Sequence, residues 1–125
     1  MKISIITCTY NRQNKLIRNI NSVVNQINKN IEHYIVDDGS TDETLEELKK
    51  LNYKHIKVIS LKNNLGQPAA LYYSKVFEIV TGDIYFLLDS DDYLLPGALD
   101  TIESDFNYYN EKNKNFISIK YSYEV

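Results

Sequence analysis

Residues 84–92 read Ile84-Tyr85-Phe86-Leu87-Leu88-Asp89-Ser90-Asp91-Asp92, an apolar run that ends in three carboxylates within four positions. The uninterrupted apolar run predicts a strand that is buried on both faces, as in a parallel sheet. The carboxylates then stand at the carboxyl end of that strand, where open α/β sheets place their ligands. Like charges this close repel one another unless a cation or a set of donors compensates, so the segment indicates a cation site.

The pattern Asp-x-Asp offers the hard oxygen ligands that Mg²⁺ and Mn²⁺ prefer, and these ions complete their coordination with water and substrate phosphates. We therefore expect Mn²⁺ or Mg²⁺ as the cofactor, with Asp91 as the most direct ligand and Asp89 and Asp92 beside it. Asp89 could instead accept a sugar hydroxyl. The alternative is a solvated loop that caps the helix expected near Pro96, although a cap needs one aspartate rather than three.

Length and composition favour one soluble globular domain, because 125 residues with 43% hydrophobic and 25% charged side chains suffice for a single core. A net charge of −3 argues against a nucleic-acid partner, since binding to phosphate backbones needs a basic face. The single cysteine, Cys8, excludes an internal disulfide. No secretion signal or transmembrane segment is seen. We expect a cytoplasmic protein, peripheral to the membrane in a full-length form.

Apolar runs that predict strands alternate along the chain with amphipathic stretches that predict helices. The expected strands cover residues 3–8, 34–36, 56–61, 84–88 and 116–123. The expected helices cover residues 13–28, a stretch after residue 43, residues 68–80 and a stretch from residue 96. Strands and helices that alternate at this spacing predict an α/β domain with a mostly parallel sheet and helices on both faces.

Helix ends and core-facing positions are also predicted by local patterns. Ser40 followed three residues later by Glu43 predicts a capping box for the second helix. Pro68 fits the first turn of the third helix, and Gly82 fits its C-terminal stop. Apolar stripes are expected from Leu16, Ile20, Val23, Val24 and Ile27 in the first helix, and from Leu99, Ile102, Phe106 and Tyr109 in the last.

Polar segments follow the first, second and fourth expected strands, whose ends meet at one edge of a parallel sheet. In Thr9-Tyr10-Asn11, the tyrosine ring offers a flat face for base stacking. In Asp37-Asp38-Gly39-Ser40, a carboxylate could accept a pyrimidine N–H or a ribose hydroxyl; a turn with a helix cap is the alternative. Asn64 and Gly66 are also explained as turn residues. The nucleotide-binding candidates are Thr9, Tyr10, Asn11, Asp38, Gly39, Asn64, Gly66, Asp89 and Ser90.

Other nucleotide and phosphate folds fit poorly. The glycines are too scattered for the dinucleotide motif G-x-G-x-x-G or for a P-loop. A haloacid-dehalogenase-like phosphatase would continue its Asp-x-Asp to Thr or Val after the first strand, whereas Tyr93 follows here after the fourth. A response-regulator receiver would need an aspartate pair after the first strand and a lysine on the fifth, for which Lys120 is the nearest candidate.

Four motifs in order resemble the family 2 glycosyltransferases of the GT-A fold. They are Ser4–Arg12, Val36–Asp42, Asn64-Leu65-Gly66 with Ala69-Ala70, and Thr81-Gly82-Asp83 leading to Leu88–Asp92 and Pro96. The resemblance implies a three-layer α/β/α, Rossmann-like domain over residues 1–125, truncated after the metal motif, that holds a nucleotide-diphosphate sugar. In the family, residues that resemble Thr9, Tyr10 and Asp38 hold the base and ribose, and the Asp-x-Asp holds the divalent metal, with Asp91 a direct ligand.

By this resemblance the full protein transfers a hexosyl or N-acetylhexosaminyl group, with inversion, from a UDP-sugar to a saccharide or lipid-linked acceptor in polysaccharide biosynthesis. The family's acceptor half and catalytic base are expected beyond Val125, so this chain alone is expected to be inactive. The alternative is a non-catalytic nucleotide or nucleotide-sugar-binding module. Leu71 replaces an arginine found in many members, which puts one donor contact in doubt. An unfinished sheet edge would permit a homo-oligomer.

Overall fold

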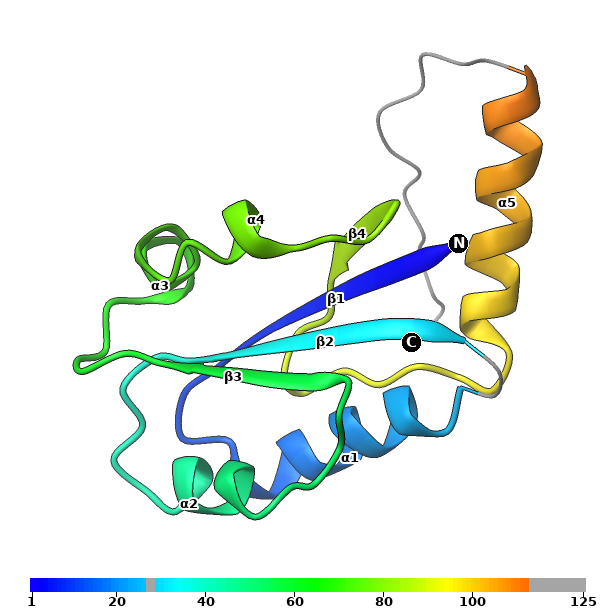
Figure 1. Cartoon of the computed structure of the whole chain (residues 1–125). Coiled ribbons are helices and arrows are strands. Elements are labelled where there is room, and N and C mark those ends of the chain that lie inside the picture. The colour runs from blue at the N-terminus through cyan, green and yellow to red at the C-terminus, as the bar shows by residue number, and fades with distance from the viewer. Residues whose placement is uncertain (27–28, 113–125) are drawn as a thin grey trace.

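The computed structural model describes residues 1–26 and 29–112, and its described strands form one parallel sheet in the order β3-β2-β1-β4 (Figure 1). The strands are β1 (Lys2–Thr9), β2 (Asn30–Asp37), β3 (Ile56–Ser60) and β4 (Ile84–Leu87). The helices are α1 (Gln13–Val24), α2 (Thr44–Lys49), α3 (Gln67–Tyr73), α4 (Val76–Ile79) and α5 (Ala98–Lys112). The predicted α/β class is therefore confirmed. The strand expected at 116–123 and the core position expected for Ile27 lie outside the described residues.

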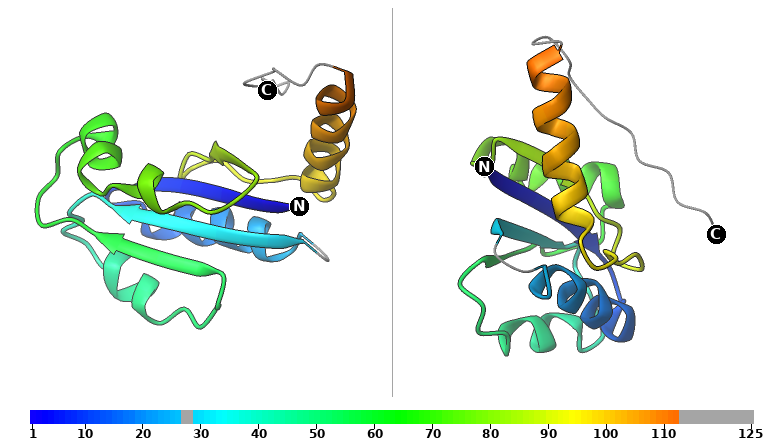
Figure 2. Two further views of the ribbon diagram at one scale, coloured as in Figure 1. Left: turned by 45° about the horizontal axis from the view of Figure 1, so that its top comes forward. Right: turned by 90° about the vertical axis from the view of Figure 1, so that its right-hand side faces the viewer.

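Helices cover both faces of the sheet, with α1 and α2 on one side and α3 and α4 on the other (Figure 2). Side chains alternate along β1, because successive residues of a strand point to opposite faces. Ile5 belongs to a core cluster with Val23 of α1, whereas Ile6 belongs to a cluster with Ala70 and Leu71 of α3. This alternation builds the three-layer α/β/α arrangement and aligns the carboxyl ends of the strands.

Strand β4 is the edge of the sheet in the described part of the chain, and it is half exposed. Tyr85 is 57% and Leu87 is 47% exposed, while Ile84 and Phe86 pack against the core. The ring of Phe77 in α4 lies 5.7 Å from that of Tyr85, centroid to centroid, but does not cover it. The prediction of a strand buried on both faces was therefore wrong for the described residues, because α4 leaves Tyr85 and Leu87 half exposed.

Two helices are shorter than the sequence predicted. Helix α1 ends at Val24, before the expected residue 28. The expected helix 68–80 is split into α3 and α4 at Lys75, whose φ of 56° is left-handed and cannot continue an α-helix. Gly82 is not a helix stop: a Cβ there would lie 2.5 Å from Oγ of Ser4, so the chain passes too close to β1 for a side chain.

The predicted capping box of α2 was also wrong. Oγ of Ser40 accepts the backbone N–H of Asn11 at 3.0 Å, and Oδ1 of Asp42 accepts the backbone N–H of Thr44 at 2.9 Å. Glu43 itself occupies the N-cap position without a side-chain cap bond. The serine thus joins two loops instead of capping a helix.

Helix α5 packs mainly through its first two turns and stands at the end of the sheet where β1 begins (Figure 1). Leu99 is buried and Ile102 packs beside it, but Tyr109 is exposed, so the apolar stripe predicted through Tyr109 is only partly buried. Lys29 pairs with Asp100 and Glu103 of this helix at 2.6 Å. Among residues 1–26 and 29–112, no helix has the length and apolar composition needed to cross a membrane.

Candidate functional site

A cavity of about 300 Å³ lies where the carboxyl ends of β1, β2 and β4 meet the loop that leads into α3. Such a volume is at the lower end of the range for small-molecule sites. Eight of the residues predicted from the sequence line it: Thr9, Tyr10, Asp38, Asn64, Gly66, Asp89, Ser90 and Asp91. The three predicted polar segments therefore converge, although 77 residues lie between Asn11 of the first and Asp89 of the last.

The acidic segment after β4 forms a tight turn. The backbone N–H of Asp92 donates to the carbonyl of Asp89 at 2.9 Å. One carboxylate oxygen from each of Asp89, Asp91 and Asp92 lies within 4.8 Å of the other two. Three hard oxygen donors at this separation suit a divalent cation with water and phosphate as its remaining ligands, so the donor set fits Mg²⁺ or Mn²⁺. Asp92 belongs to this cluster but does not line the cavity.

Asp38 connects the end of β2 to the loop before α3. The residue is 2% exposed, and its two carboxylate oxygens accept the backbone N–H groups of Leu65 at 2.8 Å and Gly66 at 2.9 Å. A carboxylate oxygen has two acceptor sites, so capacity remains on the side that faces the cavity. Asp38 can therefore both shape the cavity wall and accept a ligand proton.

Asn11 and Gly39, which the sequence also predicted as nucleotide-binding residues, do not line the cavity. The side-chain oxygen of Asn11 accepts the backbone N–H of Thr41 at 2.8 Å, which joins the loop after β1 to the loop after β2. A Cβ on Gly39 would lie 2.5 Å from the backbone carbon of Asn63, and its φ of 71° favours glycine. Both residues determine how closely neighbouring loops pack against one another. The sequence alone did not distinguish this role from contact with a ligand.

Thr9 and Tyr10 present different groups to the cavity. The Thr9 side chain is buried, and its Oγ1 has no hydrogen-bond partner among the described residues. A buried hydroxyl without a partner costs stability, which is relieved when a ligand supplies the bond. The Tyr10 ring is exposed at the rim, where a planar group could stack on it.

Sequence reasoning missed Cys8, Arg12 and Gln67, which also line the cavity. Burial, and then the charges of Asp38, Asp37 and Asp89, raises the pKa of the Cys8 thiol to about 11, so the group stays protonated near neutral pH. Arg12 brings a positive charge to a lining that is otherwise acidic. Arg12 directly follows the first polar segment, and Gln67 directly follows Gly66. This adjacency to predicted site residues could have identified both as lining residues.

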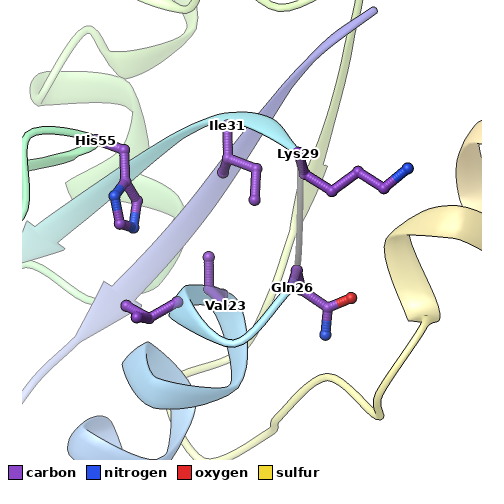
Figure 3. Close-up of a pocket in the computed structure, with 6 residues that line it drawn as sticks. Val23, Gln26, Lys29, Ile31 and His55 are labelled. Atoms are coloured by element: carbon purple, nitrogen blue, oxygen red, sulfur yellow. The ribbon is translucent and has the colours of Figure 1, made fainter.

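A second, smaller cavity of about 160 Å³ lies at the opposite end of the sheet, between α1 and the start of β2 (Figure 3). His55 and Ile31 stand above Val23, and the Lys29 side chain extends away toward α5. The Lys29 ammonium is engaged by Asp100 and Glu103, and burial lowers the pKa of His55. The described residues there form no acidic cluster, so the candidate site stays at the carboxyl ends of the strands.

Among known protein families, the model for glycosyl transferase family 2 matches residues 4–113. An uncharacterized glycosyltransferase of Haemophilus influenzae is 35% identical over 94% of the chain. The poly(ribitol-phosphate) β-N-acetylglucosaminyltransferase TarP of Staphylococcus aureus is 38% identical over 98% of the chain. The chain spans 35% and 37% of these two relatives, about a third of their length.

Among solved structures, residues 1–349 of S. aureus TarS superpose with a TM-score of 0.78 and 30% sequence identity. The match covers 88% of this chain and 33% of the TarS chain. The same TarS fragment has been crystallised with UDP and with UDP-GlcNAc, and these structures match with TM-scores of 0.77 and 0.73.

Proposed function

Because the chain belongs to glycosyl transferase family 2, we propose that its cavity binds the UDP-sugar donor of a glycosyl transfer reaction. The observation that carries the proposal is a cluster of three carboxylates, Asp89, Asp91 and Asp92, of which the first two line the cavity together with Thr9 and Asp38. A nucleoside diphosphate needs these two features together: a cation for the phosphates and polar acceptors for the base and ribose.

Asp91, Asp89 and Asp92 would hold Mn²⁺ or Mg²⁺ against the diphosphate. When bound, the ion supplies Lewis-acid stabilisation of the departing nucleoside diphosphate. Ser90, which is buried between these ligands in the turn, would contribute a hydroxyl next to the phosphates. Arg12, which also lines the cavity, would offset the remaining negative charge of the donor, since a guanidinium matches phosphate oxygens in geometry.

The nucleoside would lie between Tyr10 and the wall formed by Asp38, Asn64 and Gly66. Oγ1 of Thr9, which lacks a partner in the described residues, would bond the base or ribose. Asp38 would accept a base N–H or a ribose hydroxyl with the acceptor sites that Leu65 and Gly66 leave open. Asn11 and Gly39 would support this site by fixing the loops rather than by direct contact.

For the whole protein we propose transfer of a hexosyl or N-acetylhexosaminyl group, with inversion, to a saccharide or lipid-linked acceptor in polysaccharide biosynthesis. The names of the relatives favour these donors, since TarP is an N-acetylglucosaminyltransferase and WfaP of Escherichia coli, 34% identical, is a UDP-Glc glucosyltransferase. The base that activates the acceptor would come from beyond Val125. Cytoplasmic location, peripheral membrane contact and self-association stay predictions.

The test is the melting temperature of the chain with UDP and Mn²⁺ added separately and together. A ligand at 100 times its Kd stabilises the native state by about 2.7 kcal/mol, a rise of roughly 10 °C for a domain of this size. We expect the rise only when both are present, and a smaller one with GDP. The Asp91→Asn variant should keep its fold and lose the part of the rise in melting temperature that depends on the metal.

An unchanged melting temperature at millimolar UDP with Mn²⁺ would remove the basis of the proposal. A non-catalytic binding module would give the same rise in melting temperature. A measurement of sugar transfer is therefore needed to distinguish it from a transferase. Release of UDP from a UDP-sugar and an acceptor by the full-length protein supports the transferase, whereas tight binding without release supports the module.

A further inference from the structure

Helix α1 holds the acidic turn from behind through side-chain to backbone hydrogen bonds. Nδ2 of Asn19 donates to the carbonyl of Asp89 at 2.9 Å and to the carbonyl of Asp92 at 3.1 Å. Nη2 of Arg18 donates to the carbonyl of Asp91 at 3.2 Å. The backbone carbonyls of the three acidic residues are thus all engaged by two consecutive residues of α1.

Asn19 is unusual among the core-facing residues of α1, because it is polar and completely buried. Its amide oxygen has no hydrogen-bond partner among the described residues. A buried oxygen without a partner is unfavourable, so packing in the core by itself does not favour an amide at this position. The two hydrogen bonds from its N–H groups to the acidic turn are what distinguish Asn19 from its apolar neighbours on α1.

The contacts of Asn19 have a direct consequence for the acidic turn. Three carboxylates within 4.8 Å repel one another, and this repulsion favours any conformation of the turn that separates them. The Asn19 amide bonds the first and last carbonyls of the turn, and these two bonds oppose a change of backbone conformation that would move the carboxylates apart. Because the Asn19 amide is neutral, it holds the turn without adding a charge near the proposed cation.

Arg18 reinforces the same arrangement from the surface. Its guanidinium lies 4.3 Å from the centroid of the Tyr93 ring, directly after the turn. The stacked ring fixes the direction of the guanidinium, which strengthens its bond to the carbonyl of Asp91. The turn is therefore held at both ends by Asn19 and in the middle by Arg18.

We propose that Asn19, assisted by Arg18, is a positioning residue that sets the acidic turn in its cation-binding conformation. Asn19 acts through the backbone carbonyls of Asp89 and Asp92, and Arg18 acts through that of Asp91. Neither side chain lines the cavity. The inference rests on the proposed function, because it assumes that these carboxylates bind a divalent cation with UDP. Groups that orient metal ligands in this way are worth about 10- to 100-fold in metal affinity.

The test compares Asn19→Leu with a matched control, Gln26→Leu. Gln26 is also a buried side-chain amide, and it bonds the carbonyl of Leu95 at 3.0 Å and the N–H of Leu99 at 3.2 Å, beyond the acidic turn. Free Mn²⁺ would be measured by electron paramagnetic resonance in the presence of UDP. We expect the Kd for Mn²⁺ to rise at least about tenfold in Asn19→Leu and to stay within about twofold in Gln26→Leu.

Melting temperatures measured without metal show whether weaker Mn²⁺ binding results from a misplaced turn or from a general loss of stability. Asn19→Leu should melt no lower than Gln26→Leu and still bind Mn²⁺ more weakly. If Asn19→Leu does not fold, Arg18→Ala takes its place, because Arg18 is exposed on α1 and its variant should show weaker Mn²⁺ binding at an unchanged melting temperature.

The positioning role is overturned if Asn19→Leu, or Arg18→Ala where that variant is used, binds Mn²⁺ as tightly as the wild type. The proposed function would still stand in that case. An equal loss of affinity in Gln26→Leu also overturns it, since general loosening of the loop would then explain the effect. Failure of the wild type itself to bind Mn²⁺ with UDP overturns the proposed function together with this inference.

Discussion

The backbone N–H of Gly66 donates to Oδ2 of Asp38 at 2.9 Å, across 28 positions of sequence. This bond and its neighbour from Leu65 attach the loop before α3 to the end of β2, so one wall of the cavity depends on a single carboxylate. The sequence predicts that Asp38 binds the nucleotide, and this stays a prediction. The structure shows that its carboxylate holds the loop before α3.

Replacing Asp38 by asparagine should therefore affect stability and binding together. An amide offers one acceptor oxygen instead of two, so one buried N–H loses its partner, at a cost of about 1–3 kcal/mol. Urea unfolding should show this loss, and calorimetry should show weaker UDP binding. Glu78→Gln, on the exposed surface of α4, is the control and should change neither. Unaltered stability in Asp38→Asn would mean that the loop is held by other contacts.

Gly39→Ala and Gly66→Ala should differ in cost although both glycines have positive φ, of 71° and 85°. At Gly66 a Cβ meets nothing within 4 Å, so only backbone strain of roughly 1–3 kcal/mol is expected. At Gly39 the same strain is joined by a Cβ 2.7 Å from the backbone nitrogen of Asn64, which must move. Denaturant midpoints should fall further for Gly39→Ala; the reverse order would contradict the close packing of the two loops.

Stability should fall with pH below about 6.5 because of His33. This residue is fully buried, and burial, with a further contribution from His55, lowers its pKa to about 3. The unfolded chain then binds a proton from about pH 6.5 downward while the native state does not, which costs about 1.4 kcal/mol per pH unit. The contribution is fully present above pH 6.5 and is lost as the pH falls toward 3.

Urea unfolding between pH 7.5 and 4.5 would measure this slope. His33→Gln keeps a partner for the Thr7 hydroxyl, which lies 2.9 Å from Nε2 of His33, and should show a shallower dependence. The partly buried His55, whose pKa burial also lowers, accounts for a remaining slope. Parallel curves for the two proteins would show that His33 is not the group responsible.

Glu32 should be important for stability and unimportant for the cavity. Burial alone would raise its pKa, but hydrogen bonds from Ser4, the backbone of Thr81 and Lys2 lower that pKa well below the usual range. Glu32→Gln should cost about 2 kcal/mol or more, since several donors lose a charged acceptor. The exposed Glu46→Gln is the control for stability. UDP affinity should be unaltered, because Glu32 pairs with Ser4 toward the amino ends of β1 and β2, away from the cavity at their carboxyl ends. A weaker affinity would mean that the two ends of the sheet are energetically coupled.

The thiol of Cys8 should alkylate slowly in the native protein. A pKa of about 11 leaves roughly a hundredfold less thiolate at pH 8 than an unperturbed cysteine has. Iodoacetamide labelling followed by mass spectrometry should show slow reaction in buffer and fast reaction in urea. Asp89→Asn removes one of the charges that raise this pKa and should speed the native reaction. Fast labelling of the native wild type would contradict the burial of Cys8.

Family membership and the general architecture could be predicted from the sequence, because their signals are local. The motifs from Ser4 to Asp92 gave the family, which the match over residues 4–113 confirms. Alternating strand and helix periodicity gave the parallel sheet with covering helices, and the superposition on TarS confirms the GT-A fold. Parallel topology then brings strand ends together, so the convergence of Thr9, Asp38 and Asp89 could be expected without coordinates.

Helix limits and the exposure of β4 could not be predicted from the same signals. An apolar run looks alike in a central strand and in one that lies at the edge of the described sheet, since burial depends on which layers cover it. The helix break at Lys75 and the use of Ser40 by Asn11 likewise depend on contacts that helix patterns do not contain.

The sequence by itself determined which residue types stand at the strand ends, because strand periodicity and short motifs are properties of neighbouring residues. Only the tertiary structure decided what each of them does there. Asp38 bonds a loop 27 and 28 positions away, and Asn19 reaches a turn 70 and 73 positions away. Such bonds form when packing brings distant backbone groups within about 3 Å, and no local pattern encodes that distance.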